Sequence, residues 1–384
     1  MPKTTTTTTD TTGPNNVKYV YYHEGGVPGR RPVLTGEDAK PTFTELPRID
    51  LGRLYSTELA DHRALSSEID AAFRDVGFFY ATNHGVDKSV VDDMFSAMHR
   101  YFDLPLDVKM EAHSRQNRKF RGYEPLFSTK LDPTTRGDLK EGFLMGEDAL
   151  DAEQCAPGSA IAAQQAEAAA NSNTARNQWP GHADAQFWRA AVYRYWAALR
   201  QLSARLLRVF ALALDLPEDA FEAVTRFPIT NIRALHYPPQ TRDEDVGIGA
   251  HTDFVFFTLL CQQETAVPAL EVLNQNGVWV PAKPDRDAFV VNIGDFLKFL
   301  TGGYWQSTVH RVRNMTGEER YSVPFFYSPD EAGVVSVLER FREEGKEYEE
   351  FTAGEYFEKR LQIDRRTADG DGGGEEELRS QRAY

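Results

Sequence analysis

The chain has 384 residues, of which 41% are hydrophobic and 12% aromatic, enough apolar material for the core of one large domain or two closely joined ones. A formal net charge of -15 argues against a nucleic-acid partner, because phosphate binding requires a basic surface. No run of 18 apolar residues is present, so we expect neither a transmembrane helix nor a membrane partner.

The two ends and the cysteine content suggest a cytoplasmic protein. Residues 1–14 contain a threonine run and lack the apolar segment of a secretory signal. Residues 367–384 are rich in Gly and Glu, and we expect both ends to be disordered. The only cysteines, Cys155 and Cys261, are too few for a disulfide framework, which fits a reducing cytosol.

The first half of the chain shows helical periodicity. Apolar residues at helical spacing predict helices over residues 59–75, 87–102 and 183–214, and Pro217 is expected to open a further short helix. Residues 78–82 read as an aromatic strand, and His84 in the turn after it is interpreted as structural. We interpret the Ala-rich stretch 147–181 as either a mobile flap or a plain surface linker.

The second half of the chain reads as short strands separated by turns. The β-branched or aromatic runs that predict these strands cover residues 232–237, 256–262, 269–273, 278–282, 288–293, 308–312 and 321–327. Regularly spaced strands of this length are typical of an all-β sandwich or barrel.

Three side chains in this β region form a candidate metal site. His251 and Asp253 are two positions apart on an extended segment, so both side chains face the same way. His310, in a predicted strand, supplies a third ligand. Two imidazoles and one carboxylate on one face of an octahedron are the ligand set of non-haem Fe(II) oxygenases.

A candidate anion site follows ten residues after His310. Arg320 and Ser322 are again two apart on a predicted strand, so a guanidinium and a hydroxyl share a face. A planar guanidinium fork beside a hydroxyl donor suits one terminal carboxylate. The two sites together describe a pocket for iron and a dicarboxylic 2-oxo acid.

Taken together, these motifs resemble the isopenicillin N synthase-like branch of the Fe(II)/2-oxoglutarate-dependent oxygenases over residues 44–360. The segments that carry the resemblance occur in the family's order and are 46–51, 77–86, 102–105, 139–143, 237–239, 251–253, 291–295, 310–312 and 320–322. One departure is that Leu235 and His236 replace the Asn-Tyr pair that often precedes Tyr237 in the family.

The resemblance implies a mainly β fold with flanking helices, whose core is a double-stranded β-helix, or jelly roll. It implies that His251, Asp253 and His310 bind Fe(II), and that Arg320, Ser322 and Tyr237 bind the distal carboxylate of 2-oxoglutarate. We expect O2 as the other co-substrate, and oxidation of an unactivated C–H bond with release of succinate and CO2.

Two nearby polar residues each have two possible roles. Asn292 either lines the co-substrate pocket or, as we prefer, stabilises a turn. Arg233 shares a strand face with Tyr237, and it either meets the pocket or pairs with a nearby acid.

The resemblance also suggests five regions. These are an N-terminal extension (1–43, partly disordered), an N-terminal dioxygenase region (44–146), the insert (147–181), the jelly-roll core with its long helix (182–360) and an acidic disordered tail (361–384). We expect a small-molecule substrate, with a role in secondary metabolism. The oligomeric state is not predicted.

Two alternative functions fit some of these residues. One is an iron-dependent oxidase of the isopenicillin N synthase type, which has the Arg-x-Ser pair but does not use 2-oxoglutarate. The other is a non-catalytic metal-stabilised binding protein. The second is disfavoured because a tetrahedral structural site normally requires a fourth protein ligand or thiolates.

Overall fold

The computed structural model describes residues 18–24, 27–116, 119–131, 135, 137–148, 176–242 and 245–359. The disorder expected at residues 1–14 and 361–384, and most of the insert 147–181, lie outside the described residues. Within these residues, no helix combines the length and the apolar character needed to cross a membrane.

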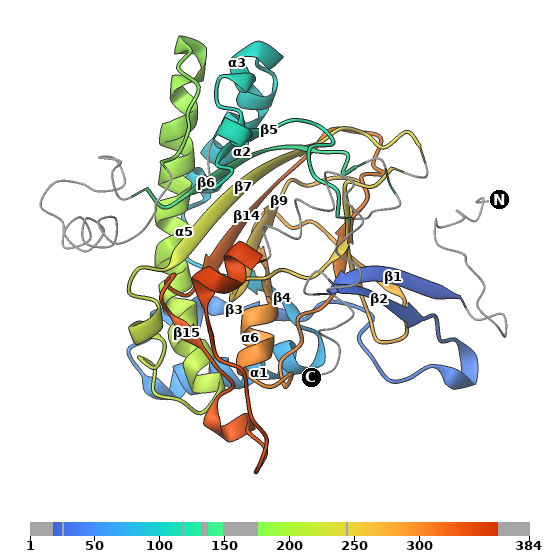
Figure 1. Cartoon of the computed structure of the whole chain (residues 1–384), viewed down its shortest axis with the longest axis vertical. Helices are drawn as coiled ribbons and strands as arrows, with labels where there is room; N and C mark the ends of the chain where they lie inside the picture. Colours follow the sequence, from blue (N-terminus) through green and yellow to red (C-terminus); the bar gives the residue numbers. More distant parts are fainter. Residues whose placement is uncertain are drawn as a thin grey trace, which may run out of the picture.

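Two large sheets form the body of the molecule (Figure 1). The eight-stranded sheet has the order β3 (Arg48–Asp50), β4 (Phe78–Thr82), β12 (Phe289–Ile293), β9 (Phe257–Gln262), β14 (Arg320–Ser328), β7 (Ile229–Tyr237), β6 (Glu141–Gly146) and β5 (Gly122–Glu124). The six-stranded sheet has the order β11 (Trp279–Ala282), β10 (Leu270–Leu273), β13 (His310–Val312), β8 (Ile248–His251), β1 (Tyr19–Glu24) and β2 (Val27–Pro32). A small hairpin pairs β15 (Val334–Val335) with β16 (Phe351–Thr352).

The two large sheets pack face to face as a jelly roll. Leu235 and Val290 of the larger sheet share one buried apolar cluster with Ile248, Val272 and Val312 of the smaller sheet. Residues on alternating positions of the same strands point to the other side of the larger sheet, as the period of two requires. The expected jelly-roll core is therefore confirmed.

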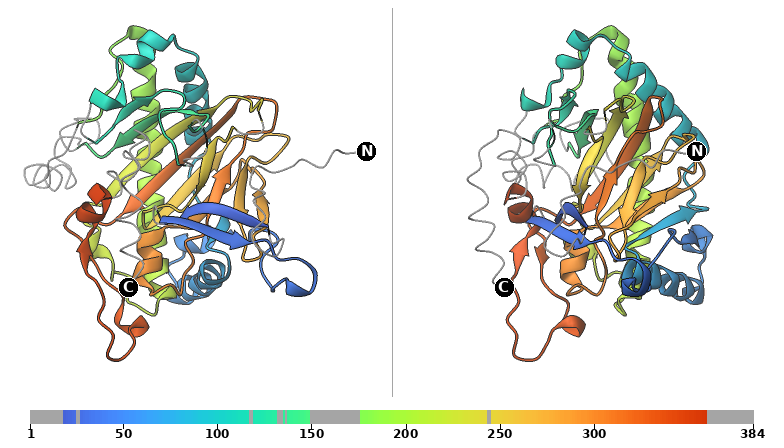
Figure 2. Two further views of the ribbon diagram at one scale, coloured as in Figure 1. Left: turned by 45° about the vertical axis from the view of Figure 1, so that its right-hand side comes forward. Right: turned by 90° about the vertical axis from the view of Figure 1, so that its right-hand side faces the viewer.

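Helices α1 (Leu59–Asp75), α2 (Lys88–Phe102) and α5 (Gln186–Ala213) cover the outer face of the larger sheet. The shorter helices are α3 (Leu106–Met110) and α6 (Asp295–Leu300), and short 3-10 turns lie at 36–38, 51–55, 114–116, 183–185, 222–224 and 339–341. Helix α5 runs along the long strands β7 and β14, and α1 and α2 pack against it (Figure 2). The large core cluster fills the layer between α5 and the sheet.

The predicted elements match the observed ones with a few differences. Helix 59–75 and strand 78–82 have the predicted bounds, and the helix predicted for 183–214 is α5 at Gln186–Ala213. The short helix expected after Pro217 is wrong: the chain forms turns and then a 3-10 turn at Glu222–Val224. Strands β1 and β2 lie in the expected extension and were not predicted. In β2, Gly, Pro and Arg residues hide the alternation, whereas β1 carries Tyr and Val residues that favour a strand, a signal that was missed.

The β1–β2 hairpin is tied to the smaller sheet at several points. Val20 packs with Leu273 in a satellite apolar cluster. Arg31 donates hydrogen bonds from Nη1 to the carbonyl oxygens of Leu273 (3.1 Å) and Asn274 (2.7 Å). Lys298 of α6 forms an ion pair with Glu24 at the end of β1. The hairpin is therefore part of the sheet rather than an appendage.

A buried polar network links the helical layer to β7. Glu141 accepts hydrogen bonds from Lys109 Nζ (2.8 Å) and from the Tyr123 hydroxyl, and its other oxygen contacts His236 Nδ1 at 2.7 Å. The His236 ring stacks on Tyr321, with centroids 4.7 Å apart. Burial alone would lower the pKa of His236, but its hydrogen bonds to carboxylates raise the pKa above the ordinary value.

This network predicts a pH-dependent contribution to stability. A raised pKa in the folded state means that protonated His236 stabilises the fold below the ordinary pKa of about 6.5, and that this stability is lost as pH rises through the folded-state value. We expect His236→Gln to lower the free energy of unfolding by about 2 kcal/mol at pH 6. The loss should be smaller at pH 9.

Urea unfolding at the two pH values measures this effect. His113→Gln is a suitable control, because His113 Nδ1 accepts a backbone hydrogen bond from Arg115 and has no acidic partner among the described residues. An equal loss of stability at pH 6 and pH 9 for His236→Gln would show that the ring contributes only by packing.

Candidate functional site

The three predicted metal ligands come together where β8 pairs with β13. His310 lies directly opposite His251 in this antiparallel pair, and Asp253 follows two residues after the end of β8. Asp253 Oδ1 lies 3.6 Å from His251 Nε2 and 3.7 Å from His310 Nε2. One ligand atom from each residue lies within 4.8 Å of the others. Metal bonds of about 2.1 Å to nitrogen or oxygen fit these separations.

Backbone carbonyls orient both imidazoles toward one point. His251 Nδ1 contacts the Gly249 carbonyl oxygen at 2.8 Å, and His310 Nδ1 contacts that of Thr308 at 3.2 Å. A carbonyl can only accept, so each Nδ1 carries the proton and each Nε2 keeps a free lone pair. Hydrogen bonds of this kind fix the tautomer that binds metal.

The second oxygen of Asp253 is held by two donors. Its Oδ2 accepts from the Thr258 hydroxyl at 2.6 Å and from Asn292 Nδ2 at 2.9 Å. Our preference for a turn-stabilising role of Asn292 was wrong, since its amide supports the carboxylate instead. Thr258 was missed because a threonine in a strand carries no distinctive sequence signal.

The protonation states suit metal binding. Burial, together with the nearby charge of His251, lowers the pKa of His310 to about 4, so this ring is neutral at pH 7. Burial opposes ionisation of Asp253, but the two histidines and the Asn292 hydrogen bond outweigh it and hold the pKa of Asp253 below its usual range. Burial would lower the pKa of His251 as well, but its hydrogen bond to Asp253 raises the pKa above the ordinary value. A carboxylate and a neutral imidazole are the forms that coordinate a metal ion, so metal binding at His251 competes with a proton.

The predicted carboxylate clamp lies between the two sheets on β7 and β14. Arg320 is opposite Tyr237 in the strand pairing, and its guanidinium carbon lies 4.8 Å from the centre of the Tyr237 ring. Arg320 Nη1 donates to Ser322 Oγ at 3.4 Å. Each of these three side chains is 1% exposed. The structure thus brings together the residues that the sequence placed in this clamp.

Arg320 has no acidic partner among the described residues. Its described hydrogen bonds go to Ser322 and, at 2.8 Å from Nη2, to the carbonyl oxygen of the Gln262 side chain. Burial lowers the pKa of Arg320, and the group that opposes this is Tyr237 rather than a carboxylate. A buried cation without a counter-ion costs several kcal/mol, so the pocket is built for an anion that is not part of the described chain.

Other candidates from the sequence have structural partners. Arg233 forms an ion pair of 2.6 Å with Glu124, the second of the two roles considered for it. His84 is buried, and its ring lies edge-on to Phe289 with centroids 4.5 Å apart. It also accepts a hydrogen bond from the Val86 amide, which agrees with its structural interpretation.

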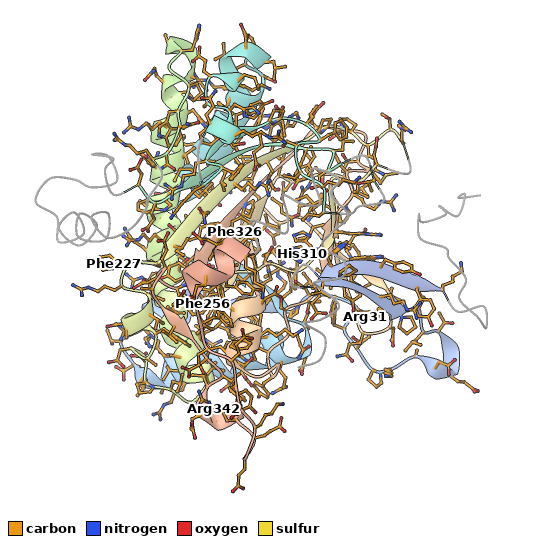
Figure 3. The ribbon with its side chains drawn as sticks, in the orientation of Figure 1. Arg31, Phe227, Phe256, His310, Phe326 and Arg342 are labelled. Atoms are coloured by element: carbon orange, nitrogen blue, oxygen red, sulfur yellow. The ribbon has the colours of Figure 1, made fainter. Side chains whose placement is uncertain are left out.

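The β1–β2 hairpin reaches the metal site. His23 pairs with His251, and its carbonyl oxygen accepts a 3.2 Å hydrogen bond from the amide of Thr252, between two candidate ligands. In Figure 3, His310 lies beside the end of the β1–β2 hairpin where His23 pairs with His251; Arg31 marks the hairpin in this view. The hairpin therefore fixes the peptide that joins His251 to Asp253.

Comparison with known proteins identifies the family. Residues 46–182 match the family model described as non-haem dioxygenase in morphine synthesis, N-terminal, and residues 228–329 match that of the 2OG-Fe(II) oxygenase superfamily. The 2-oxoglutarate-Fe(II) type oxidoreductase ppzC of Metarhizium rileyi is 34% identical over 333 residues, which cover 84% of this chain and 87% of that protein. The chain belongs to the 2OG-Fe(II) oxygenase superfamily.

Solved structures share the fold of this oxygenase. Neurospora crassa T7H in complex with alpha-KG has a TM-score of 0.70 at 23% identity, over 85% of this chain and 98% of that one. JOX2 in complex with 2OG, Fe and JA has a TM-score of 0.66 at 24% identity, over 86% of this chain and 88% of that one.

Family membership settles the class of reaction. The protein is a non-haem iron dioxygenase that uses 2-oxoglutarate and O2, as expected from its motifs. The alternative of an iron oxidase that dispenses with 2-oxoglutarate is not favoured, since the fungal relative carries 2-oxoglutarate in its name. Strands β1 and β2 precede the first matched residue, so the hairpin beside the metal site lies outside both family models.

The support of Asp253 by Asn292 and Thr258 generates a prediction. Removing the donors should free the carboxylate to rotate, and loss of such outer hydrogen bonds typically lowers metal affinity by about 10- to 100-fold. We expect Asn292→Ala and Thr258→Val each to weaken Fe(II) binding by about tenfold, measured by anaerobic titration.

Asn231→Ala serves as a control, since Asn231 lies on β7 and is not one of the donors to Asp253. If the Asn292 and Thr258 variants bind Fe(II) as tightly as the parent protein, the hydrogen bonds to Asp253 do not contribute to metal affinity.

Proposed function

We propose that His251, Asp253 and His310 hold the Fe(II) of this dioxygenase, and that Arg320, Ser322 and Tyr237 bind the distal carboxylate of 2-oxoglutarate. The substrate is a small molecule with an unactivated C–H bond, which is hydroxylated, desaturated or rearranged. The observation that carries this proposal is a buried guanidinium without an acidic partner among the described residues, facing the interior that also holds the three ligands.

The donor set fits iron and the co-substrate. Two imidazole nitrogens and one carboxylate oxygen are available, and three protein ligands leave the remaining positions of an octahedron for small ligands. When bound, iron with 2-oxoglutarate supplies O2 activation coupled to formation of succinate and CO2.

The protein's own side chains position the reactants and exclude water. Arg320 offers a planar pair of donors, to which a carboxylate can bind with two parallel hydrogen bonds. Ser322 and Tyr237 add hydroxyl groups next to it. The apolar cluster between the sheets, with Leu235 and Ile248, keeps this end of the pocket dry and so strengthens the charge interaction.

Several observations support a small-molecule substrate in secondary metabolism. The formal charge of -15 opposes binding of nucleic acid. The fold neighbour JOX2 was solved with the ligand JA beside 2OG and Fe. The relative ppzC is a fungal oxidoreductase of the same type. We infer that the protein acts in the cytoplasm, which fits its low cysteine content.

Uncoupled turnover tests the residue assignment without knowledge of the substrate. The Fe(II)-loaded protein is mixed with 2-oxoglutarate and O2, and succinate and O2 uptake are measured. We expect no succinate from His251→Ala. Arg320→Ala should require roughly 100-fold more 2-oxoglutarate for half-maximal rate, because about 3 kcal/mol of charge pairing is lost.

Arg340→Ala is the matched control, because Arg340 lies in the 3-10 turn 339–341, outside both large sheets, and forms a surface ion pair with Asp215. If 2-oxoglutarate neither binds nor decarboxylates while Fe(II) still binds, the substrate-driven oxidase becomes the better explanation. If Arg320→Ala retains the parent's 2-oxoglutarate requirement, the carboxylate lies elsewhere.

A further inference from the structure

In the buried side chain of Gln262, the amide oxygen has a hydrogen-bond partner and the amide nitrogen has none among the described residues. Gln262 is the last residue of β9 and lies directly opposite Ser322 of β14, so both side chains lie on the same face of the sheet. Its Oε1 accepts a 2.8 Å hydrogen bond from Arg320 Nη2. Its Nε2 is buried and has no hydrogen-bond partner among the described residues.

The orientation of this amide follows from chemistry. A guanidinium has only donors, so the atom of Gln262 that faces Arg320 must be the acceptor oxygen. The amide nitrogen shares one carbon atom with that oxygen and therefore lies beside the guanidinium. Leaving a buried N–H donor unsatisfied costs about 1–3 kcal/mol, so its position calls for an acceptor.

The groups around this donor restrict what the acceptor is. Arg320, Ser322 and Tyr237 offer a cation and two hydroxyls, and no carboxylate of the described residues pairs with Arg320. An acceptor that satisfies the Gln262 amide and neutralises Arg320 at once is an anion with at least two oxygens.

We propose that Gln262 is a positioning residue for 2-oxoglutarate. Its Oε1 accepts a hydrogen bond from the Arg320 guanidinium and orients it, and its Nε2 donates a hydrogen bond to the distal carboxylate. The proposal rests on the function assigned above to Arg320. It adds β9 to the two strands that form the clamp, and it explains why a fully buried amide, 3% exposed, is left half satisfied.

Anaerobic binding of 2-oxo acids to the Fe(II) protein tests this role without turnover. The visible charge-transfer absorption of the iron–2-oxo acid chelate reports the dissociation constant. The two probes are 2-oxoglutarate and 2-oxopentanoate, which has the same chain length and chelating end but lacks the distal carboxylate. Gln262→Met keeps the length and volume of the side chain and removes both polar atoms.

We expect Gln262→Met to raise the dissociation constant of 2-oxoglutarate about tenfold, the loss of one hydrogen bond to a charged group. The dissociation constant of 2-oxopentanoate should stay within about twofold of the parent value, because this acid has no distal carboxylate that could accept a hydrogen bond from Gln262. The exposed Gln275→Met in the turn between β10 and β11 should change neither constant.

A second variant keeps the test independent of packing. Gln262→Glu replaces the donor with an acceptor and provides Arg320 with a carboxylate partner. We expect this variant to raise the dissociation constant of 2-oxoglutarate about 100-fold, by pairing with Arg320 and repelling the ligand. Its melting temperature without 2-oxoglutarate should be at least that of the parent protein.

The outcomes separate the two proposals. The role of Gln262 is overturned if Gln262→Met binds 2-oxoglutarate as the parent does, or if it loses affinity equally for both acids. The role of Arg320 stands in that case, provided that Arg320→Ala binds 2-oxoglutarate weakly. Unchanged binding in Arg320→Ala overturns the assignment of the clamp itself, and the role of Gln262 with it.

Discussion

The register between β8 and β13 is the constraint on which the site depends. His251 and His310 face each other in this pair, and a slip of one residue would turn one imidazole to the opposite face of the sheet. The register is held from both sides. β10 pairs with β13 on one edge, and on the other edge the His23 carbonyl binds the amide of Thr252. The metal geometry is therefore a property of the sheet, and the hairpin outside the family models contributes to it.

The second constraint is the energy of a buried charge. Arg320 is held in an apolar interior by neutral partners, so without an anion it keeps only part of its solvation. A ligand that brings a carboxylate recovers this energy, which a neutral ligand cannot do. The desolvation of Arg320 thus makes the clamp selective for an anion. The three candidate metal ligands make their site selective for a cation, since their lone pairs point to one place.

The sequence predicts the fold class and the candidate ligands because these depend on local patterns. Side chains two apart in a strand share a face, which is enough to group His251 with Asp253 and Arg320 with Ser322. It does not predict Gln262, whose position depends on which strands become neighbours. Strand β2 escapes prediction for the same reason, since its Gly, Pro and Arg residues form a strand only by pairing with β1.

Strand β9 connects the two halves of the site mechanically. Thr258 contacts the proposed metal ligand Asp253. Gln262, four residues along on the same face, contacts Arg320. An extended strand rises by about 3.4 Å per residue, so the two contacts are set about 14 Å apart along its backbone. The strand is paired on both edges, with β12 and with β14, and cannot lengthen or shorten. In the roles proposed above, the separation between the iron ligands and the Arg320 guanidinium is therefore set by strand pairing. A fixed separation favours a 2-oxo acid of one chain length, with its second carboxylate at Arg320.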